Sequence, residues 1–291
     1  MKTNSLPTQK LAEYTFGLIT PLSPDVVRSP YMEDIISSIV QELLALDYDM
    51  KWIMIRDRAL DRYGLSHLLA EYNHIDGFIV PCWKHFPKLI HDLEERPDLP
   101  TVLINDFDPN IALSTVYCEN KTGVHQIFNH FVKKGYKKIG MVKGPIHVSP
   151  DARERCEEFK KCAAEASIPI HDTNVYESSR FDEEAGYHVM RFWLQRGDLP
   201  EAIFCANDDL ARGSILALQE KKIRIPEEVA IAGFDDSRRN ILLDPPLTTV
   251  RQPFEELGSV AVQTLLRLIQ KKDKAPVRLK LNPTLIVRKS A

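Results

Sequence analysis

The chain has 291 residues, of which 44% are hydrophobic and 27% charged, a composition typical of a globular protein with a proper core. This length exceeds that of one typical domain, so two medium-sized domains are expected. The formal net charge of −3, with lysine pairs scattered among carboxylates, argues against a DNA-binding face on this chain by itself. No apolar run is long enough for a membrane span, and Met1–Tyr14 lacks a signal-peptide core, which predicts a cytoplasmic protein.

The cysteines and the missing motifs exclude several kinds of chemistry. Five cysteines are an odd number without a C-x-x-C pair, which indicates a reducing compartment rather than a disulfide framework or a zinc site. Cys118 and Cys205 lie in apolar runs and are expected to be small core residues. The chain has no G-x-G-x-x-G, phosphate-loop, G-x-S-x-G or H-E-x-x-H motif. We therefore expect no enzymatic activity, no cofactor and no metal.

Strand-like runs alternate with amphipathic helical stretches along the whole chain. The first series contains strands at Thr15–Ile19, Lys51–Ile55, Gly77–Val80, Thr101–Ile104 and Thr115–Cys118, with helices at Tyr31–Leu46 and Lys121–Lys134. The second series contains strands at Lys138–Val142, Val175–Glu177, Ala202–Cys205 and Val229–Phe234, with helices at Asp151–Ala166, Asp182–Gln195 and from Asn207 to about Lys222. A helix at Phe254–Gln270 and strands at Val277–Leu281 and Leu285–Val287 complete the chain.

Two successive series of this kind predict an α/β fold with two parallel-type sheets rather than a single barrel. Ligands of such sheets gather beyond the carboxyl ends of the strands, and two facing sheets form a cleft. The polar residues that follow strands are therefore the candidates for ligand contacts.

Several of these polar residues have a structural interpretation beside the functional one. Arg155 is placed to grip hydroxyls or a carboxylate, or it is a surface arginine paired with a neighbouring glutamate. Asn207 either contacts a ligand or only caps its helix. Asp235 accepts hydrogen bonds from a ligand or from its own turn. Phe181 offers a stacking face, or it staples the helix that follows.

One long stretch, Ala202–Val262, resembles the bacterial LacI/GalR transcription regulators. Its ANDDLARG, IPEEVAIAGFDD and PPLTTVRQP are the characteristic segments, and the closing NPTLIVRKS is similar to the last strand of that family. Weaker similarities are GLITPLS near the start and GYKKIGMVKGP at Gly135–Pro145. The resemblance extends over nearly the whole chain from Tyr14.

The resemblance implies a type I periplasmic-binding-protein-like fold, with two Rossmann-like lobes joined by three crossover strands. Residues 14–131 and 254–270 would form the N-terminal lobe, and residues 132–250 and 271–291 the C-terminal lobe. It also implies a homodimer that senses a small polar effector, such as a sugar, a sugar derivative or a nucleobase. The residues that correspond to effector contacts are Arg155, Asp235, Asn207, Phe181, Gln252 and Tyr31.

This chain departs from the family pattern in three respects. Glu119 stands where the family has aspartate, and Glu158 where it has glycine. Only thirteen residues precede Tyr14, whereas family members begin with a helix-turn-helix and a hinge. We favour truncation of that head, with residues 1–13 as a hinge remnant or disordered arm, over its natural absence. Operator DNA is then a partner of the full-length protein only.

Two other functions remain alternatives. A solute-binding protein of a sugar transport system shares this fold, but it would need a signal peptide or a lipid-anchor cysteine near Met1. An enzyme on the same scaffold would turn over its bound ligand, and no set of residues here indicates one.

Overall fold

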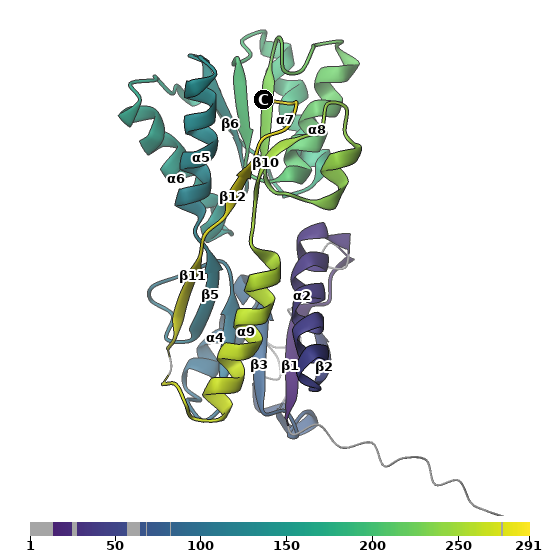
Figure 1. Cartoon of the computed structure of the whole chain (residues 1–291), viewed down its shortest axis with the longest axis vertical. Helices are drawn as coiled ribbons and strands as arrows, with labels where there is room; N and C mark the ends of the chain where they lie inside the picture. Colours follow the sequence, from purple (N-terminus) through teal and green to yellow (C-terminus); the bar gives the residue numbers. More distant parts are fainter. Residues whose placement is uncertain (1–13, 25–27, 57–64, 68, 82, 275) are drawn as a thin grey trace, which may run out of the picture.

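The computed structural model describes residues 14–24, 28–56, 65–67, 69–81, 83–274 and 276–291. The predicted hinge remnant, residues 1–13, lies outside the described residues. Two lobes lie end to end, each built around its own sheet (Figure 1). Among the described residues, no helix is both long and apolar enough to cross a membrane.

The first lobe contains a six-stranded parallel sheet in the order β11-β5-β4-β3-β1-β2. Its strands are β1 (Thr15–Pro21), β2 (Asp49–Ile55), β3 (Gly77–Pro81), β4 (Thr101–Ile104), β5 (Ser114–Cys118) and β11 (Arg278–Leu281). The helices are α2 (Pro30–Leu46), α4 (Pro87–Glu94) and α9 (Phe254–Ile269), with a 3₁₀ turn η1 (Trp83–His85). Every residue of β3 and β4 is buried, as expected for parallel strands covered on both faces.

The two faces of this sheet bury different sets of side chains. Ile79 packs with residues of α2 and α9, whereas Phe78 and Val80 pack with residues of α4, because successive side chains of a strand point to opposite faces. The helices α2 and α9 approach closely at Gly258, where a Cβ atom would lie 2.1 Å from Ser38 Oγ.

The second lobe contains a six-stranded sheet in the order β12-β10-β9-β8-β6-β7, parallel except for β12. Its strands are β6 (Ile139–Lys143), β7 (Val175–Glu177), β8 (Ala202–Cys205), β9 (Ala230–Asp235), β10 (Thr248–Arg251) and β12 (Thr284–Ile286). The helices are α5 (Asn120–Lys133), α6 (Pro150–Glu165), α7 (Glu183–Arg196) and α8 (Asp208–Glu220), with 3₁₀ turns η2 (Asp172–Asn174) and η3 (Arg238–Leu242). Cys118 and Cys205 are both buried, as predicted for core residues.

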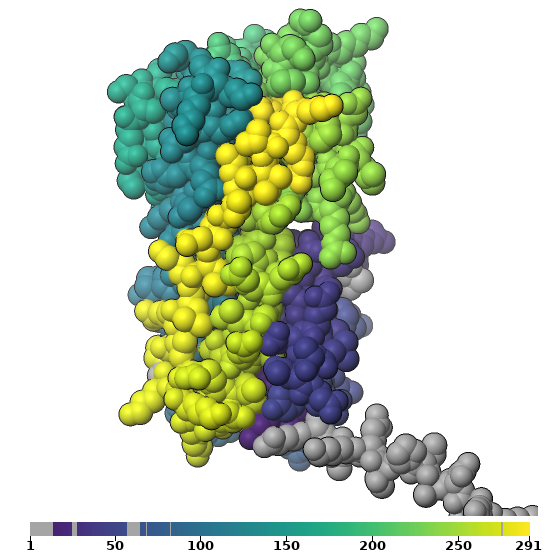
Figure 2. All heavy atoms as spheres, in the orientation of Figure 1, coloured from purple at the N-terminus to yellow at the C-terminus, as the bar shows by residue number. Residues whose placement is uncertain are grey.

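Three segments carry the chain between the lobes. They connect β5 to α5, β10 to α9 and β11 to β12, and the last of these runs along the front of the molecule (Figures 1 and 2). The predicted fold class, two parallel-type sheets joined by three crossovers, is confirmed.

The lobes differ from the predicted boundaries at two places. The predicted first lobe of residues 14–131 includes α5, but α5 packs against α6 and the second sheet. The predicted second lobe includes residues 271–291, but β11 pairs with β5 in the first sheet. In both cases the chain changes lobe where a strand ends, directly after Cys118 and Leu281. We place the lobe boundaries at these strand ends.

Candidate functional site

Arg155 is fixed in the interior by its own helix and by the neighbouring elements. Ser149 caps α6, since its side chain accepts a hydrogen bond from Ala152 N at 3.2 Å. Arg155 lies in the second turn and is only 4% exposed. Its Nε donates to Asn120 Oδ1 and its Nη1 donates to the Ala206 carbonyl, both at 2.7 Å. The predicted alternative, a surface arginine paired with a glutamate, is therefore wrong.

Asp235 faces Arg155 from the end of β9. Its Oδ1 lies 4.0 Å from Arg155 Nη1 and accepts a hydrogen bond from Gln252 Nε2 at 2.7 Å. Its φ of 121° is a conformation that non-glycine residues rarely adopt. Burial raises the pKa of Asp235 to about 7, and the positive charge of Arg155 offsets only part of that effect.

Asn105 connects Arg155 and Asp235 to the first lobe through Gln252. The sequence analysis did not identify Asn105 as a site residue. It follows β4 directly, is 1% exposed, and its Nδ2 donates to Tyr31 Oη at 2.6 Å and to Gln252 Oε1 at 3.2 Å. Its Oδ1 accepts from Cys118 N at 2.9 Å. Its position directly after a buried strand was the available signal, the same one that identified Asn207.

Asn207 and Phe181 lie beside each other at the ends of β8 and the loop before α7. Asn207 caps α8 by accepting from Leu210 N at 2.9 Å, so the structural interpretation of this residue holds. Its Nδ2 donates to the Phe181 carbonyl at 3.2 Å. The Phe181 ring packs against Gly144, where a Cβ atom would lie 2.3 Å from the ring. Gly144 is therefore needed at the end of β6 to admit this ring.

Four of the predicted residues, together with Asn105, form one connected set of contacts across the boundary between the lobes. Tyr31, Asn105 and Gln252 lead to Asp235 and Arg155. The remaining predicted pair, Asn207 and Phe181, contact each other. Asn207 directly follows Ala206, whose carbonyl accepts a hydrogen bond from Arg155. Donors and acceptors from both sheets thus meet at the carboxyl ends of the parallel strands, where open α/β folds bind ligands.

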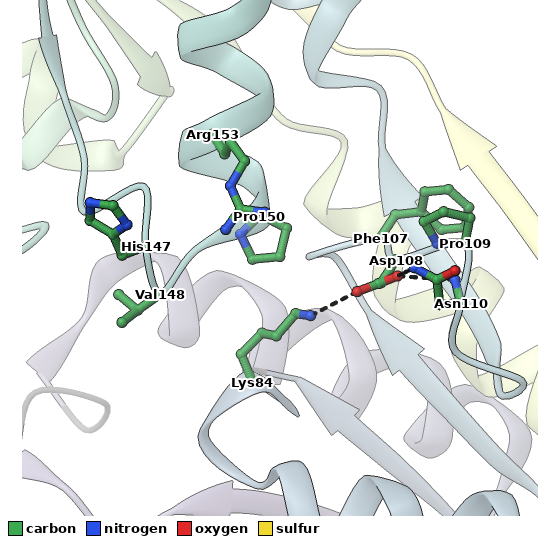
Figure 3. Close-up of a pocket in the computed structure, with 9 residues that line it drawn as sticks. All are labelled: Lys84, Phe107, Asp108, Pro109, Asn110, His147, Val148, Pro150 and Arg153. Carbon is green, nitrogen blue, oxygen red and sulfur yellow. Dashed lines mark hydrogen bonds and ion pairs between the residues drawn. The ribbon is translucent and has the colours of Figure 1, made fainter.

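A pocket of about 310 Å³ lies between loops of the two lobes (Figure 3). The first lobe contributes Lys84, whose Nζ lies 3.2 Å from Asp108 Oδ2, and the second lobe contributes His147 and Arg153. Arg155 and Asp235 do not line this pocket. The pocket is therefore distinct from the contacts around Arg155 and Asp235.

A second contact between the lobes involves two carboxylates. Asp106, which follows Asn105, accepts hydrogen bonds from Ser149 Oγ at 3.3 Å and from Asp151 N at 3.4 Å. Burial and, next, the neighbouring carboxylate of Asp151 together raise the pKa of Asp106 to about 7. The lobes thus meet at a point where the charge state of Asp106 changes near neutral pH.

Comparison with known proteins agrees with this architecture. The sequence profile of the periplasmic binding protein-like domain matches residues 128–291. The chain is 32% identical over 279 residues to the HTH-type transcriptional repressor PurR of Haemophilus influenzae strain PittEE, covering 95% of this chain and 81% of that protein.

Solved structures of transcription regulators have the same fold. The transcriptional regulator CelR in complex with cellobiose is 24% identical, with a TM-score of 0.81, covering 95% of this chain and 84% of the other. The lac repressor dimer bound to operator is 22% identical, with a TM-score of 0.82, covering 98% and 95%.

The sequence similarity to a repressor favours a regulator over the solute-binding alternative. The relative is a transcriptional repressor rather than an enzyme, in keeping with the function expected from the sequence. The chain belongs to the LacI family of transcription regulators, and it is the effector-sensing, periplasmic-binding-protein-like domain of such a regulator.

Proposed function

We propose that Arg155 and Asp235 bind the effector directly and that this effector is a neutral, hydroxyl-rich molecule such as a sugar. The observation that supports the proposal is the opposed pair itself, two buried groups of opposite charge with 4.0 Å between Arg155 Nη1 and Asp235 Oδ1. The guanidinium donates hydrogen bonds and the carboxylate accepts them, so together they bind hydroxyl groups, which do both.

The surroundings of this pair support a ligand without net charge. The positive charge of Arg155 already faces Asp235 at 4.0 Å and Asp151 at 4.0 Å, so no cationic excess is left for an anion. Phe181, whose ring is half-buried, is the aromatic residue to which the CH face of a sugar would pack. The bound cellobiose named for the regulator CelR is a ligand of this class.

Ligand contacts from both lobes would favour one arrangement of the lobes over the others. Tyr31 and Asn105 belong to the first lobe, whereas Arg155 and Asp235 belong to the second. We propose that a homodimer transmits this change to operator DNA through a DNA-binding head of the full-length regulator, in the cytoplasm. The lac repressor structure, a dimer on its operator, illustrates such an assembly.

A thermal-shift screen of the purified chain against sugars, polyols, sugar phosphates and nucleobases tests the ligand class. A ligand at a hundred times its dissociation constant adds about 2.7 kcal/mol to the free energy of unfolding, which gives a clear shift in Tm. Neutral sugars or polyols are the expected class. Stabilisation by nucleobases or phosphates alone would overturn the proposed class.

Variants of the opposed pair test the assignment of the residues. Arg155→Lys keeps the charge but loses the planar fork, and Asp235→Asn loses the charged acceptor. Each should weaken ligand binding by more than about tenfold, since a hydrogen bond to a charged group contributes about 1.5–3 kcal/mol. Lys160→Arg, an exposed position on the same helix that does not line the pocket, is the matched control. Wild-type affinity in both site variants would refute the assignment.

A further inference from the structure

His125, Glu158 and Cys162 bring three different metal-ligating groups to one point between α5 and α6. One ligand atom from each residue lies within 4.8 Å of the other two. His125 Nε2 is 2.5 Å from Glu158 Oε1. Of the residues that the structure describes, these three form the one such group of histidine, cysteine and carboxylate side chains.

The arrangement follows from how the two helices pack. Glu158 and Cys162 are four residues apart on α6, so they lie on the same face, one turn after the other. The contact between α5 and α6 begins at Asn120, which binds Arg155, and continues to Phe128, whose ring meets that of Phe159 at 5.5 Å. His125 lies between these two fixed contacts and is held opposite Glu158. The three ligands are thus positioned by the fold rather than by a short sequence motif.

We propose that His125, Glu158 and Cys162 bind a divalent transition-metal ion, with Zn²⁺ as the best match. Imidazole, thiolate and carboxylate are the three ligand types of Zn²⁺ in proteins, and a thiolate disfavours Mg²⁺ and Ca²⁺. Glu158 and Cys162 are 5% and 4% exposed, whereas the His125 side chain is 37% exposed. The ion would enter past His125, and water would complete its four-coordinate shell. Cys162 gives up its thiol proton to solvent on binding.

Lys161 is the competitor for the same carboxylate. Its Nζ lies 3.2 Å from Glu158 Oε1, the oxygen that also faces His125. The Lys161 side chain is 60% exposed, and an ion pair of that kind contributes little to stability because water solvates the freed ammonium. A bound ion would therefore displace Lys161 at small cost. Replacing it, as in Lys161→Ala, should strengthen metal binding.

The metal site is separate from the candidate effector site, and the proposal does not depend on it. Arg155 precedes Glu158 by one turn of α6 and turns instead toward Asn120 and Ala206. The two sites share the helices α5 and α6 but no side chain. Their tests are consequently independent, since substitutions at His125, Glu158 or Cys162 leave the contacts of Arg155 in place.

Cobalt provides a direct readout of the thiolate ligand. The purified chain is titrated with Co²⁺ and then with Zn²⁺ in competition, and the thiolate-to-metal charge-transfer absorption is recorded. Saturable binding with this absorption is expected for the wild type. Cys162→Ser should abolish the absorption, and His125→Ala and Glu158→Gln should each weaken the binding of Zn²⁺ by at least about tenfold.

Cys156→Ser is the matched control, because Cys156 is a second buried thiol on the same helix but is not part of the group. It should bind Co²⁺ and Zn²⁺ as the wild type does. Circular dichroism of each metal-free variant checks that the fold is retained, and Glu158→Gln keeps the size of the side chain for this purpose. Wild-type absorption in Cys162→Ser, its loss in Cys156→Ser, or no saturable Zn²⁺ binding below millimolar concentration would each overturn the proposal.

Discussion

The guanidinium group of Arg155 lies against the ring of Phe234, with 3.8 Å between its central carbon and the ring centre. The two residues come from α6 and β9, and the ring supports one face of the arginine fork. The hydrogen bonds to Asn120 and Ala206 fix the orientation of the guanidinium plane. Arg155 is therefore held in one orientation before any ligand arrives, which lowers the entropic cost of binding.

Gly123→Ala tests whether Phe234 must keep this position. A Cβ atom at residue 123 would lie 2.6 Å from the Phe234 ring and 2.9 Å from Val250 Cγ1. Alanine in a helix normally stabilises by about 0.5–1 kcal/mol over glycine. Overpacking a core typically costs about 1–3 kcal/mol, so a net loss of stability is expected. Urea denaturation measures it, and a variant as stable as the wild type would show that the ring can move freely.

Asn105→Gly tests how much the side chain of Asn105 stabilises the fold. Glycine tolerates the φ of 58° at this position but cannot accept the hydrogen bond from Cys118 N. A buried donor without a partner costs about 1–3 kcal/mol, so the free energy of unfolding should fall by about that amount. Thermal or urea denaturation provides the measurement.

The control for this variant is a second substitution that removes a different contact between the lobes. Arg238→Ala removes an ion pair in which Arg238 Nε lies 3.6 Å from Asp34 Oδ1 and the Arg238 side chain is 81% exposed. It should change stability by less than about 0.5 kcal/mol. Equal losses of stability for Asn105→Gly and Arg238→Ala would contradict the prediction that Asn105 makes the larger contribution to stability.

The pKa of Asp106 predicts a stability that depends on pH. The pKa is raised from 3.8 to about 7 in the folded state, chiefly by burial and then by Asp151. The stability that protonated Asp106 contributes is therefore fully present below the pKa of the unfolded state. It is lost as the pH rises through the pKa of the folded state. The wild type should lose at least about 1 kcal/mol between pH 5 and pH 8, the scale of one pKa unit.

Asp106→Asn should remove the part of this dependence that comes from Asp106, because the amide carries no charge at either pH. The part that comes from Asp235, whose pKa is also raised to about 7, should remain. At pH 8 the variant should be more stable than the wild type. Asp108→Asn, on the same loop, is the comparison, since the pKa of Asp108 is lowered, chiefly by the N–H of Asn110. Unfolding at a series of pH values measures both, and identical profiles for the wild type and Asp106→Asn would refute the prediction.

The strands and their polar ends could be predicted because they depend on local pattern. Fully apolar runs such as Ala202–Cys205 predicted buried parallel strands, and every residue of β8 is buried. Of the six residues that the resemblance indicated, four are connected across the boundary between the lobes: Tyr31, Gln252, Asp235 and Arg155. Asn207 and Phe181 contact each other within the second lobe. Asn105 follows the buried strand β4 and so met the same criterion as Asn207, but no local pattern shows that it connects the two lobes.

The sequence by itself determined the alternation of strands and helices, the two sheets and the residues at the strand ends, because periodicity and capping are properties of neighbours in the chain. Only the tertiary structure decided where the lobes divide, which side chains face Arg155, and that His125 meets Glu158 and Cys162. These features depend on how segments that are distant in the sequence pack together. For example, α5 packs against α6 of the second lobe, although β5, just before it in the sequence, belongs to the first sheet. Contacts of that kind arise from burial of whole helix faces, which no single stretch of sequence encodes.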